Sequence, residues 1–236
     1  AINKHTGDLV WRGEPKEEIV GDTKSRYFAT PVVYDGRSGK QVVLFNTQGV
    51  HSLDAGSGTA SWFYPWDTSG APPVADPLFF EQKLFVSTSE LNSVGALLDI
   101  SQSEPRKLWE SPDLGTHIST SVYLDGYIYG IHGDYNTHIR KCNLRCIDAA
   151  SGELLWQSDE MIGGSVTAVN GALIVLNASG TVRVVEATPD AYIEVAAGVL
   201  PQTTGSHRWW TSPAIHGSEA YFRNFMGDLV CVNLKG

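Results

Sequence analysis

Short runs rich in β-branched and aromatic residues recur along the whole chain, and a turn signal separates each run from the next. Between residues 117 and 156, for example, four such runs read as strands at 117–126, 127–131, 144–149 and 153–156. Asp-Gly, Asn-Gly and Ser-Gly pairs between apolar runs are typical of tight hairpin turns. Apolar residues at helical spacing are absent, so the pattern predicts an all-β fold.

One phrase returns at fixed spacing: an Asp or Asn, a Gly four residues later and a Trp eight residues later. Its three full copies are Asn3, Gly7 and Trp11; Asp54, Gly58 and Trp62; and Asp148, Gly152 and Trp156. A looser copy has Asp99 and Trp109, and two further positions, Glu186 and Asn233, carry no Trp. The repeat unit is therefore roughly 40–50 residues long.

Each residue type in this phrase has a structural use. An Asp or Asn side chain accepts hydrogen bonds from the backbone of the turn that follows it. Glycine adopts the positive φ that a tight turn needs. A Trp on an outer strand buries its ring against the neighbouring unit, while its indole N–H finds an acceptor. The phrase predicts a structural staple and not an active site.

Four strands in each unit, repeated around an axis, predict a β-propeller with four-stranded blades and about five blade equivalents. A single domain covers residues 1–236. Its units are a partial one at 1–25, four complete ones at 26–70, 71–114, 115–160 and 161–200, and a partial one at 201–236.

The two ends of the chain leave two arrangements open. Residues 7–11 read as an outer strand, whereas the last unit lacks its outer strand. A closed five-bladed ring requires an antiparallel ladder between residues 8–11 and 229–232. The turn that starts at Asn3 duplicates the turn that starts at Asn233, which favours a piece of a larger ring.

Composition narrows the classes of function. The chain has 236 residues, 42% of them hydrophobic, and a formal net charge of −9 without a Lys/Arg cluster. This balance argues against nucleic acid as a partner. No apolar run is long enough for a transmembrane helix. The first residues lack the basic and apolar regions of a signal peptide, so none is expected within this chain.

The segments at 3–11, 53–62 and 146–156 resemble the tryptophan-docking repeat of the pyrroloquinoline-quinone (PQQ)-like propellers. Residues 153–195 and 208–234 are similar to the last blades of bacterial PQQ-like repeat proteins of the planctomycete type. The resemblance implies an eight-bladed ring, of which this chain would be the C-terminal part, and an exported, periplasmic protein. The superfamily includes quinoprotein alcohol dehydrogenases and a lipoprotein of the outer-membrane β-barrel assembly machinery.

An enzyme of this superfamily holds its quinone between a tryptophan and a disulfide of adjacent cysteines, beside a calcium-type ion and an Asp base. Here the three cysteines, Cys142, Cys146 and Cys231, include no adjacent pair, and no matching Glu–Asn–Asp set is found. No cofactor is therefore predicted. A PQQ-dependent dehydrogenase stays the alternative function.

Two further kinds of chemistry have weaker support. A propeller glycosidase needs paired carboxylates near the channel, but Asp76 is the one acid among the first strands, and a turn-capping role suits it better. A zinc site needs three or four convergent ligands. His132, Asp134 and His138 lie in one insertion, for which a solvated loop is the favoured interpretation. No catalytic residue and no metal ligand are predicted.

The remaining class is binding. The segments that enter each first strand are expected to line one mouth of the channel. Their aromatic, cationic and histidine side chains are the candidate binding residues: Arg26, Tyr27, His117, Arg208 and Trp209. Aromatic and Arg side chains are enriched in interaction hot spots. Packing of Tyr27 and Trp209 between blades is the open alternative. The sequence thus predicts a non-catalytic binding or scaffold module for a protein or small ligand that it does not identify.

Overall fold

Every regular element in the computed structural model is a β-strand within the residues that the structure describes, which are 1–13, 28–66, 68, 73–89, 93–133, 141–201 and 208–234. The prediction of an all-β fold is confirmed. In the same residues, no helix has the length and hydropathy to cross a membrane.

The strands form five antiparallel sheets in chain order, each of which serves as one blade. Blade 1 contains β1 (Val32–Gly36), β2 (Gly39–Asn46), β3 (Gly49–Asp54) and β4 (Ala60–Pro65). Blade 2 contains β5 (Leu78–Phe80), β6 (Lys83–Thr88), β7 (Val94–Asp99) and β8 (Arg106–Ser111). Blade 3 contains β9 (Val122–Leu124), β10 (Tyr127–His132), β11 (Asn143–Asp148) and β12 (Leu154–Gln157). Blade 4 contains β13 (Gly164–Val169), β14 (Ala172–Asn177), β15 (Thr181–Glu186) and β16 (Glu194–Val199). Blade 5 has three strands, β17 (Ala214–His216), β18 (Glu219–Arg223) and β19 (Leu229–Asn233).

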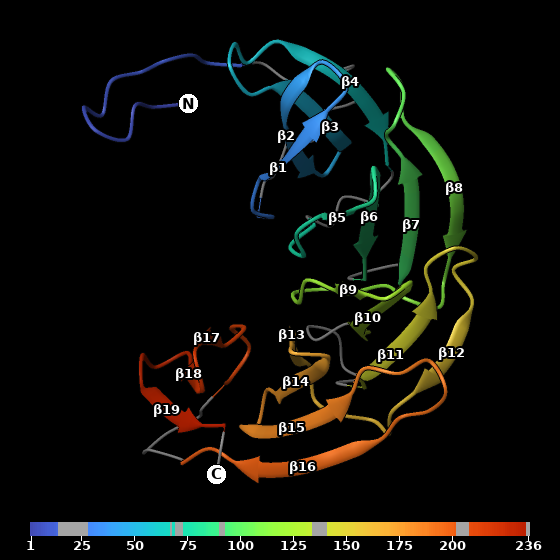
Figure 1. The fold of residues 1–236 in the computed structure, drawn as a ribbon, viewed down its shortest axis with the longest axis vertical. Coiled ribbons are helices and arrows are strands. Elements are labelled where there is room, and N and C mark those ends of the chain that lie inside the picture. Colours follow the sequence, from blue (N-terminus) through green and yellow to red (C-terminus); the bar gives the residue numbers. More distant parts are fainter. Residues whose placement is uncertain are drawn as a thin grey trace.

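The blades follow one another around an open arc, with the first strand of each blade toward the centre and the fourth strand on the outer side (Figure 1). The two ends of the chain lie at opposite ends of this arc (Figure 1). Leu9 bridges to Ile2, and β19 pairs with β18, so the described residues form no ladder between 8–11 and 229–232. The closed five-bladed alternative is therefore wrong, and the expected open propeller is confirmed.

The hydrophobic cores lie between successive blades. Between blades 2 and 3, Phe85 and Leu97 pack with Ile128 and Ile147 from the facing sheet. Equivalent clusters join blades 1 and 2, blades 3 and 4, and blades 4 and 5. Side chains alternate across each strand, so a blade inside the arc buries one set of residues against each neighbour.

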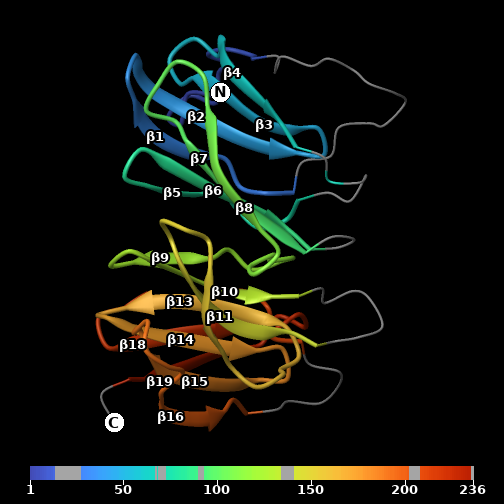
Figure 2. The same cartoon turned by 90° about the vertical axis from the view of Figure 1, so that its right-hand side faces the viewer.

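Three repeat tryptophans each dock on the next blade along the chain, at the turn between its third and fourth strands. Figure 2 shows the blades from the side. The indole N–H of Trp11 donates to Ala55 O at 3.0 Å, and that of Trp109 to Ala149 O at 3.0 Å. Trp156 donates to Thr188 O at 2.7 Å. In blades 1 and 3 the receiving turn has a glycine where no side chain fits: at Gly152, with φ +78°, a Cβ would lie 2.7 Å from Trp109 Cε3, and at Gly58 it would lie 2.3 Å from Trp11 Cε3.

The Asp of the repeat stabilises the same turn, because its side chain accepts hydrogen bonds from the residues of that turn. Asp54 Oδ1 accepts hydrogen bonds from the backbone of Gly56 and Ser57 and from the Ser57 hydroxyl, at 3.1, 2.8 and 2.8 Å. Asp148 does the same with Ala150 and Ser151. The hydrogen bonds from Ser57 lower the pKa of Asp54. The turn is thus built around an ionised carboxylate that accepts several donors.

Trp62 departs from this geometry. Its indole N–H donates within its own blade, to the hydroxyl of Tyr34 at 3.1 Å. The ring shares a core cluster with Ile100, which follows Asp99 in the turn of blade 2. That turn has no glycine in the repeat position, and a side-chain hydroxyl replaces the backbone carbonyl as the acceptor.

Replacing Trp156, which is 8% exposed, tests the structural role of the repeat. Trp156→Ala is expected to lower the free energy of unfolding by about 3–5 kcal/mol, because it leaves a cavity between blades 3 and 4. Trp156→Phe keeps a ring in place and loses the hydrogen bond to Thr188, so about 1 kcal/mol is expected. Urea titrations followed by circular dichroism measure both. Wild-type stability in Trp156→Ala would refute the staple interpretation.

Candidate functional site

The structure describes three of the five predicted channel-mouth residues and does not gather these three into one site. Arg26 and Tyr27 lie outside the described residues. His117 is 6% exposed in the connection to β9, whereas Trp209 is 0% exposed and Arg208 is exposed, both in the connection to β17. The sheet of blade 4 separates these two connections along the arc.

Trp209 packs between blades. It shares a core cluster with Leu176, Leu200 and Phe222, and its backbone N–H donates to Ala178 O at 3.0 Å. A Cβ on Gly180, in the turn between β14 and β15, would lie 2.9 Å from Trp209 Nε1. The alternative of packing therefore applies to this residue.

His117 joins two of the segments that lead into first strands, the one before β9 and the one before β5. Its carbonyl accepts a hydrogen bond from Ala75 N at 3.2 Å. Its side chain borders a cavity of about 10 Å³, which it shares with Ile131, Cys142 and Gly164. A space of this size holds about one water molecule at most, so it is no ligand pocket.

Asp76 links three blades. Its Oδ1 accepts a hydrogen bond from Thr30 N at 2.5 Å, and its own N–H donates to Thr120 Oγ1 at 3.0 Å. Thr30, Asp76 and Thr120 each precede the first strand of their blade by two residues. The carboxylate caps the backbone of the preceding blade, whereas the sequence had suggested that it caps its own turn.

A second repeated turn was missed in the sequence. An Asn followed three residues later by Gly ends the second strand of blades 1, 4 and 5, at Asn46, Asn177 and Asn224. Asn46 Oδ1 accepts the backbone N–H of Gln48 and Gly49 at 2.9 and 3.0 Å. The spacing was visible, but without a Trp it resembled an ordinary hairpin signal.

These turns position the connections beside them. Trp66 N donates to Gln48 O at 3.2 Å after β4, and Phe225 N donates to Arg208 O at 2.9 Å before β17. The turn between β18 and β19 and the connection to β17 are thereby held together, which brings residues 208–210 next to residues 225 and 226.

The resulting surface consists of Arg208, Trp210, Phe225 and Met226 and is called the aromatic–cation surface below. Phe225 and Met226 are 63% and 62% exposed. The rings of Trp210 and Phe225 meet edge to face at 5.8 Å, and Arg208 Cζ lies 5.9 Å from the Trp210 ring. The four residues line a hollow of about 360 Å³. Because apolar side chains gather here in the open, the aromatic–cation surface is the candidate interaction site.

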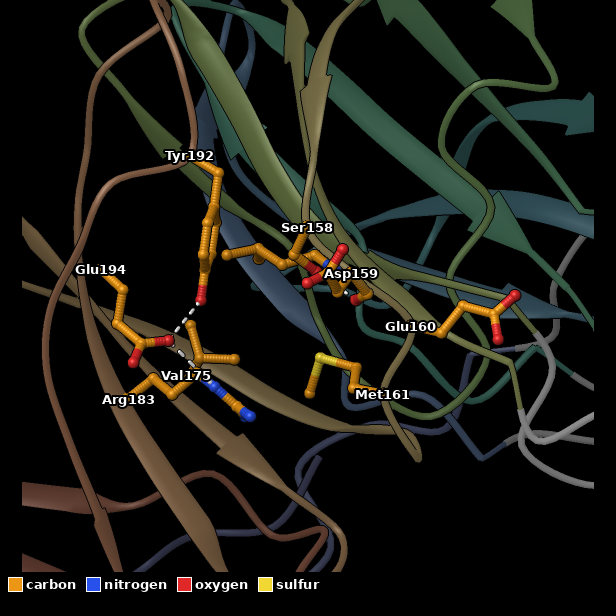
Figure 3. Close-up of a pocket in the computed structure, with 9 residues that line it drawn as sticks. Ser158, Asp159, Glu160, Met161, Val175, Arg183, Tyr192 and Glu194 are labelled. Atoms are coloured by element: carbon orange, nitrogen blue, oxygen red, sulfur yellow. Dashed lines mark hydrogen bonds and ion pairs between the residues drawn. The ribbon is translucent and has the colours of Figure 1, made fainter.

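A second hollow, of about 130 Å³, lies between the outer strands of blades 3 and 4 (Figure 3). Glu194 Oε2 accepts a hydrogen bond from the Tyr192 hydroxyl at 2.9 Å and pairs with Arg183 Nε at 3.1 Å. Glu160 points away from this group (Figure 3). Because its carboxylates do not converge, the hollow does not offer the carboxylate pair of a glycosidase.

A half-buried histidine lies between blades 2 and 3. His132 Nδ1 accepts a hydrogen bond from Gly115 N at 3.1 Å, and Arg145 Nη1 donates to Asp113 O at 2.7 Å. Burial, and then the nearby Arg145 charge, lower the pKa of His132 to about 4. The ring is therefore neutral at pH 7 and acts as an acceptor that joins the two blades.

The residues present do not fit the quinone site of a dehydrogenase. Cys146 is buried, and burial raises the pKa of its thiol to about 12. All three cysteines are free thiols, and no two of them are adjacent in the sequence. Within the described ranges, no three His, Cys, Asp or Glu side chains gather as a metal site would require. Asp134 and His138 lie outside those ranges.

A PQQ-repeat family model described as outer membrane protein assembly factor BamB matches residues 1–122, just over half of the 236 residues. A search of curated proteins gave no match.

Solved structures with the same fold include BamB from Moraxella catarrhalis, with a TM-score of 0.61 and 18% identity over 87% of this chain and 59% of that one. The quinohemoprotein alcohol dehydrogenase ADHIIG from Pseudomonas putida HK5 gives a TM-score of 0.65 and 13% identity over 94% and 44%. The computationally designed protein Ika8 gives 0.64 and 10% over 97% and 62%. The chain thus spans less than two thirds of each of these proteins.

The half-buried His132 predicts a dependence of stability on pH. Its pKa of about 4 in the folded chain lies below the ordinary value of 6.5. As the pH falls from 6.5 toward 4, the unfolded chain therefore binds a proton that the folded chain does not, and stability decreases. His132→Asn keeps an acceptor without this titration, so its urea midpoint should change less between pH 7 and pH 4.5.

Exposed His216 offers the matched control. His216→Asn should leave the pH dependence of the midpoint as in the wild type. An equal pH dependence in His132→Asn and the wild type would contradict the assignment.

Proposed function

The chain belongs to the PQQ-repeat family described as outer membrane protein assembly factor BamB, and we propose that it is a binding or scaffold propeller rather than an enzyme. The aromatic–cation surface is the observation that carries this proposal. A guanidinium beside two aromatic rings and a methionine suits a protein partner that offers apolar side chains next to a carboxylate.

The architecture supports a scaffold role. Asp76 and the half-buried His132 act in contacts between blades, and the thiol of Cys146 is protonated at neutral pH. Asp76 and His132 therefore serve to hold neighbouring blades together. Arg208 and its aromatic neighbours form the exposed surface that we assign to recognition.

We propose that the chain binds its protein partner in the periplasm, outside the cytoplasm. Support comes from the family description, which names outer-membrane protein assembly. The formal net charge of −9 gives no attraction to nucleic acid.

A peptide-display experiment tests the binding role. Random peptides are selected on the wild-type chain, and those retained are measured against Phe225→Ala and Trp210→Ala. Each variant should weaken binding by about tenfold or more, in the range of hot-spot truncations. Phe28→Ala is the matched control, because Phe28 is also 63% exposed but lies before β1. Selected peptides that bind all variants equally would refute this site.

The alternative function, a PQQ-dependent dehydrogenase, has its own test. The chain is incubated with PQQ and Ca²⁺, and dye reduction is followed with a panel of alcohols and sugars. No turnover above that of PQQ and Ca²⁺ alone is expected. Robust turnover would overturn the proposal in favour of the enzyme.

A further inference from the structure

The outer strand of blade 4, β16, pairs with β15 on one side and has a free backbone edge on the outside of the arc (Figure 1). All six of its residues are exposed. Residues 195–199 carry neither a charge nor a proline. Edge strands are usually kept from pairing with other chains by charged side chains, by proline or by short length.

The outer strands of the other four-stranded blades have these protective features. β8 contains Arg106, Lys107 and Glu110, and β4 ends at Pro65. β12 is only four residues long. β16 is therefore the least protected of the four outer strands. Blades 3 and 4 both have all four strands, so the side of β16 that faces blade 3 does not lie at an end of the arc.

The backbone groups of alternate residues in β16 point outward. Leu200 N, one residue after the strand, donates to Gly180 O at 2.9 Å. Hydrogen-bonded and non-hydrogen-bonded pairs alternate along an antiparallel ladder. The pairs that Val199 and Ala197 form with β15 are therefore the non-bonded ones. The N–H and C=O groups of these two residues are open to an added strand.

The side chains of Ala197 and Val199 lie on the side of the sheet that faces blade 3. Ala197 is paired with Arg183, which lines the hollow between blades 3 and 4 (Figure 3). Val199 follows two residues later on the same side and is 69% exposed. An added strand would therefore place every second side chain next to an exposed valine or next to the hollow.

The hollow favours positive charge in such a strand. Three carboxylates line it, those of Asp159, Glu160 and Glu194, against the one guanidinium of Arg183. Glu194 is paired with Arg183 and Glu160 with Lys141, each at 3.1 Å. Asp159 is exposed and is in no ion pair with another described residue. The formal net charge of −9 acts in the same direction.

We propose that β16 is a docking edge for an extended, basic segment of a partner protein, which adds a fifth strand to blade 4. The segment pairs with the backbone of Ala197 and Val199, covers Val199 with an apolar side chain and places a Lys or Arg near Asp159. A second copy of the chain is a poorer occupant, because it carries the same net charge of −9. The docking edge does not include the aromatic–cation surface, so this inference goes beyond the proposed function.

Fluorescence anisotropy tests the docking with two labelled eight-residue peptides, one that alternates Lys with Val and one that alternates Glu with Val. The Lys peptide should bind about tenfold or more tightly than the Glu peptide. Ala197→Pro removes an outward N–H, which an edge strand tolerates, and should weaken binding of the Lys peptide by about tenfold. Glu110→Pro, at the corresponding position of β8, is the matched control and should leave binding nearly unchanged.

A Lys peptide that does not bind, or that binds no better than the Glu peptide, would overturn the proposal, and so would equal effects of the two prolines. Circular dichroism checks that both proline variants are folded. Phe225→Ala should leave binding of the Lys peptide unchanged, which separates this result from the test of the aromatic–cation surface.

Amide hydrogen exchange tests the strand pairing directly. With the Lys peptide bound, the N–H groups of Ala197 and Val199 should exchange more slowly. Those of Ala196 and Gly198 already bond to β15 and should change little. Unchanged exchange at Ala197 and Val199 would contradict strand addition.

Asp159→Asn tests the preference for positive charge. It should weaken binding of the Lys peptide about two- to fivefold, the range of an exposed ion pair. Asp125→Asn, in the exposed turn between β9 and β10, is the matched control and should have no effect. Equal affinities of the two variants would remove the hollow from the proposal's docking edge and overturn its basic partner.

Sedimentation of the chain without peptide tests the other occupant. The wild type should stay monomeric at the concentrations used for anisotropy. Self-association that Ala197→Pro abolishes would assign the edge of β16 to a second copy and overturn the proposal.

Discussion

The docking of an indole on the turn of the next blade is the contact on which the arrangement depends. A blade of three or four short strands cannot bury both of its faces by itself, so its stability comes from its neighbours. The indole N–H of Trp109 donates to a backbone carbonyl of the following blade, and its ring covers Gly152, where no side chain fits. One residue thus satisfies a polar group, fills the space between two sheets and sets their spacing.

This contact explains why the fold could be predicted from the sequence. The Asp or Asn, the Gly and the Trp of the repeat lie within nine residues, so one short segment carries both the turn geometry and the docking residue, and three full copies of it occur along the chain. The spacing of these three residues does not predict which group accepts the hydrogen bond from the indole N–H. Trp62 donates to the Tyr34 hydroxyl and Trp156 to the backbone carbonyl of Thr188, although the turn that each of them faces lacks the repeat glycine.

The candidate site could be predicted only in part, for a physical reason. Trp209 and Trp210 are neighbours of the same type, and the sequence pointed to Trp209, which is fully buried. In an irregular connection, the side that a residue faces is decided by contacts with distant turns, here Trp209 N to Ala178 O and Phe225 N to Arg208 O. Asp76 shows the same limit, because its partner Thr30 lies 46 residues away.

The same repeat position has opposite properties at different points of the arc. Cys146 and Cys231 occupy equivalent places, yet the first is fully buried with a raised thiol pKa and the second is exposed. Their local strands and cross-strand partners are alike, a Tyr in both cases, so local sequence does not cause the difference. The cause is the presence of a fourth strand and a following blade over Cys146. In such a repeat, the burial of a side chain therefore depends on what stacks on its blade and not only on its own strand.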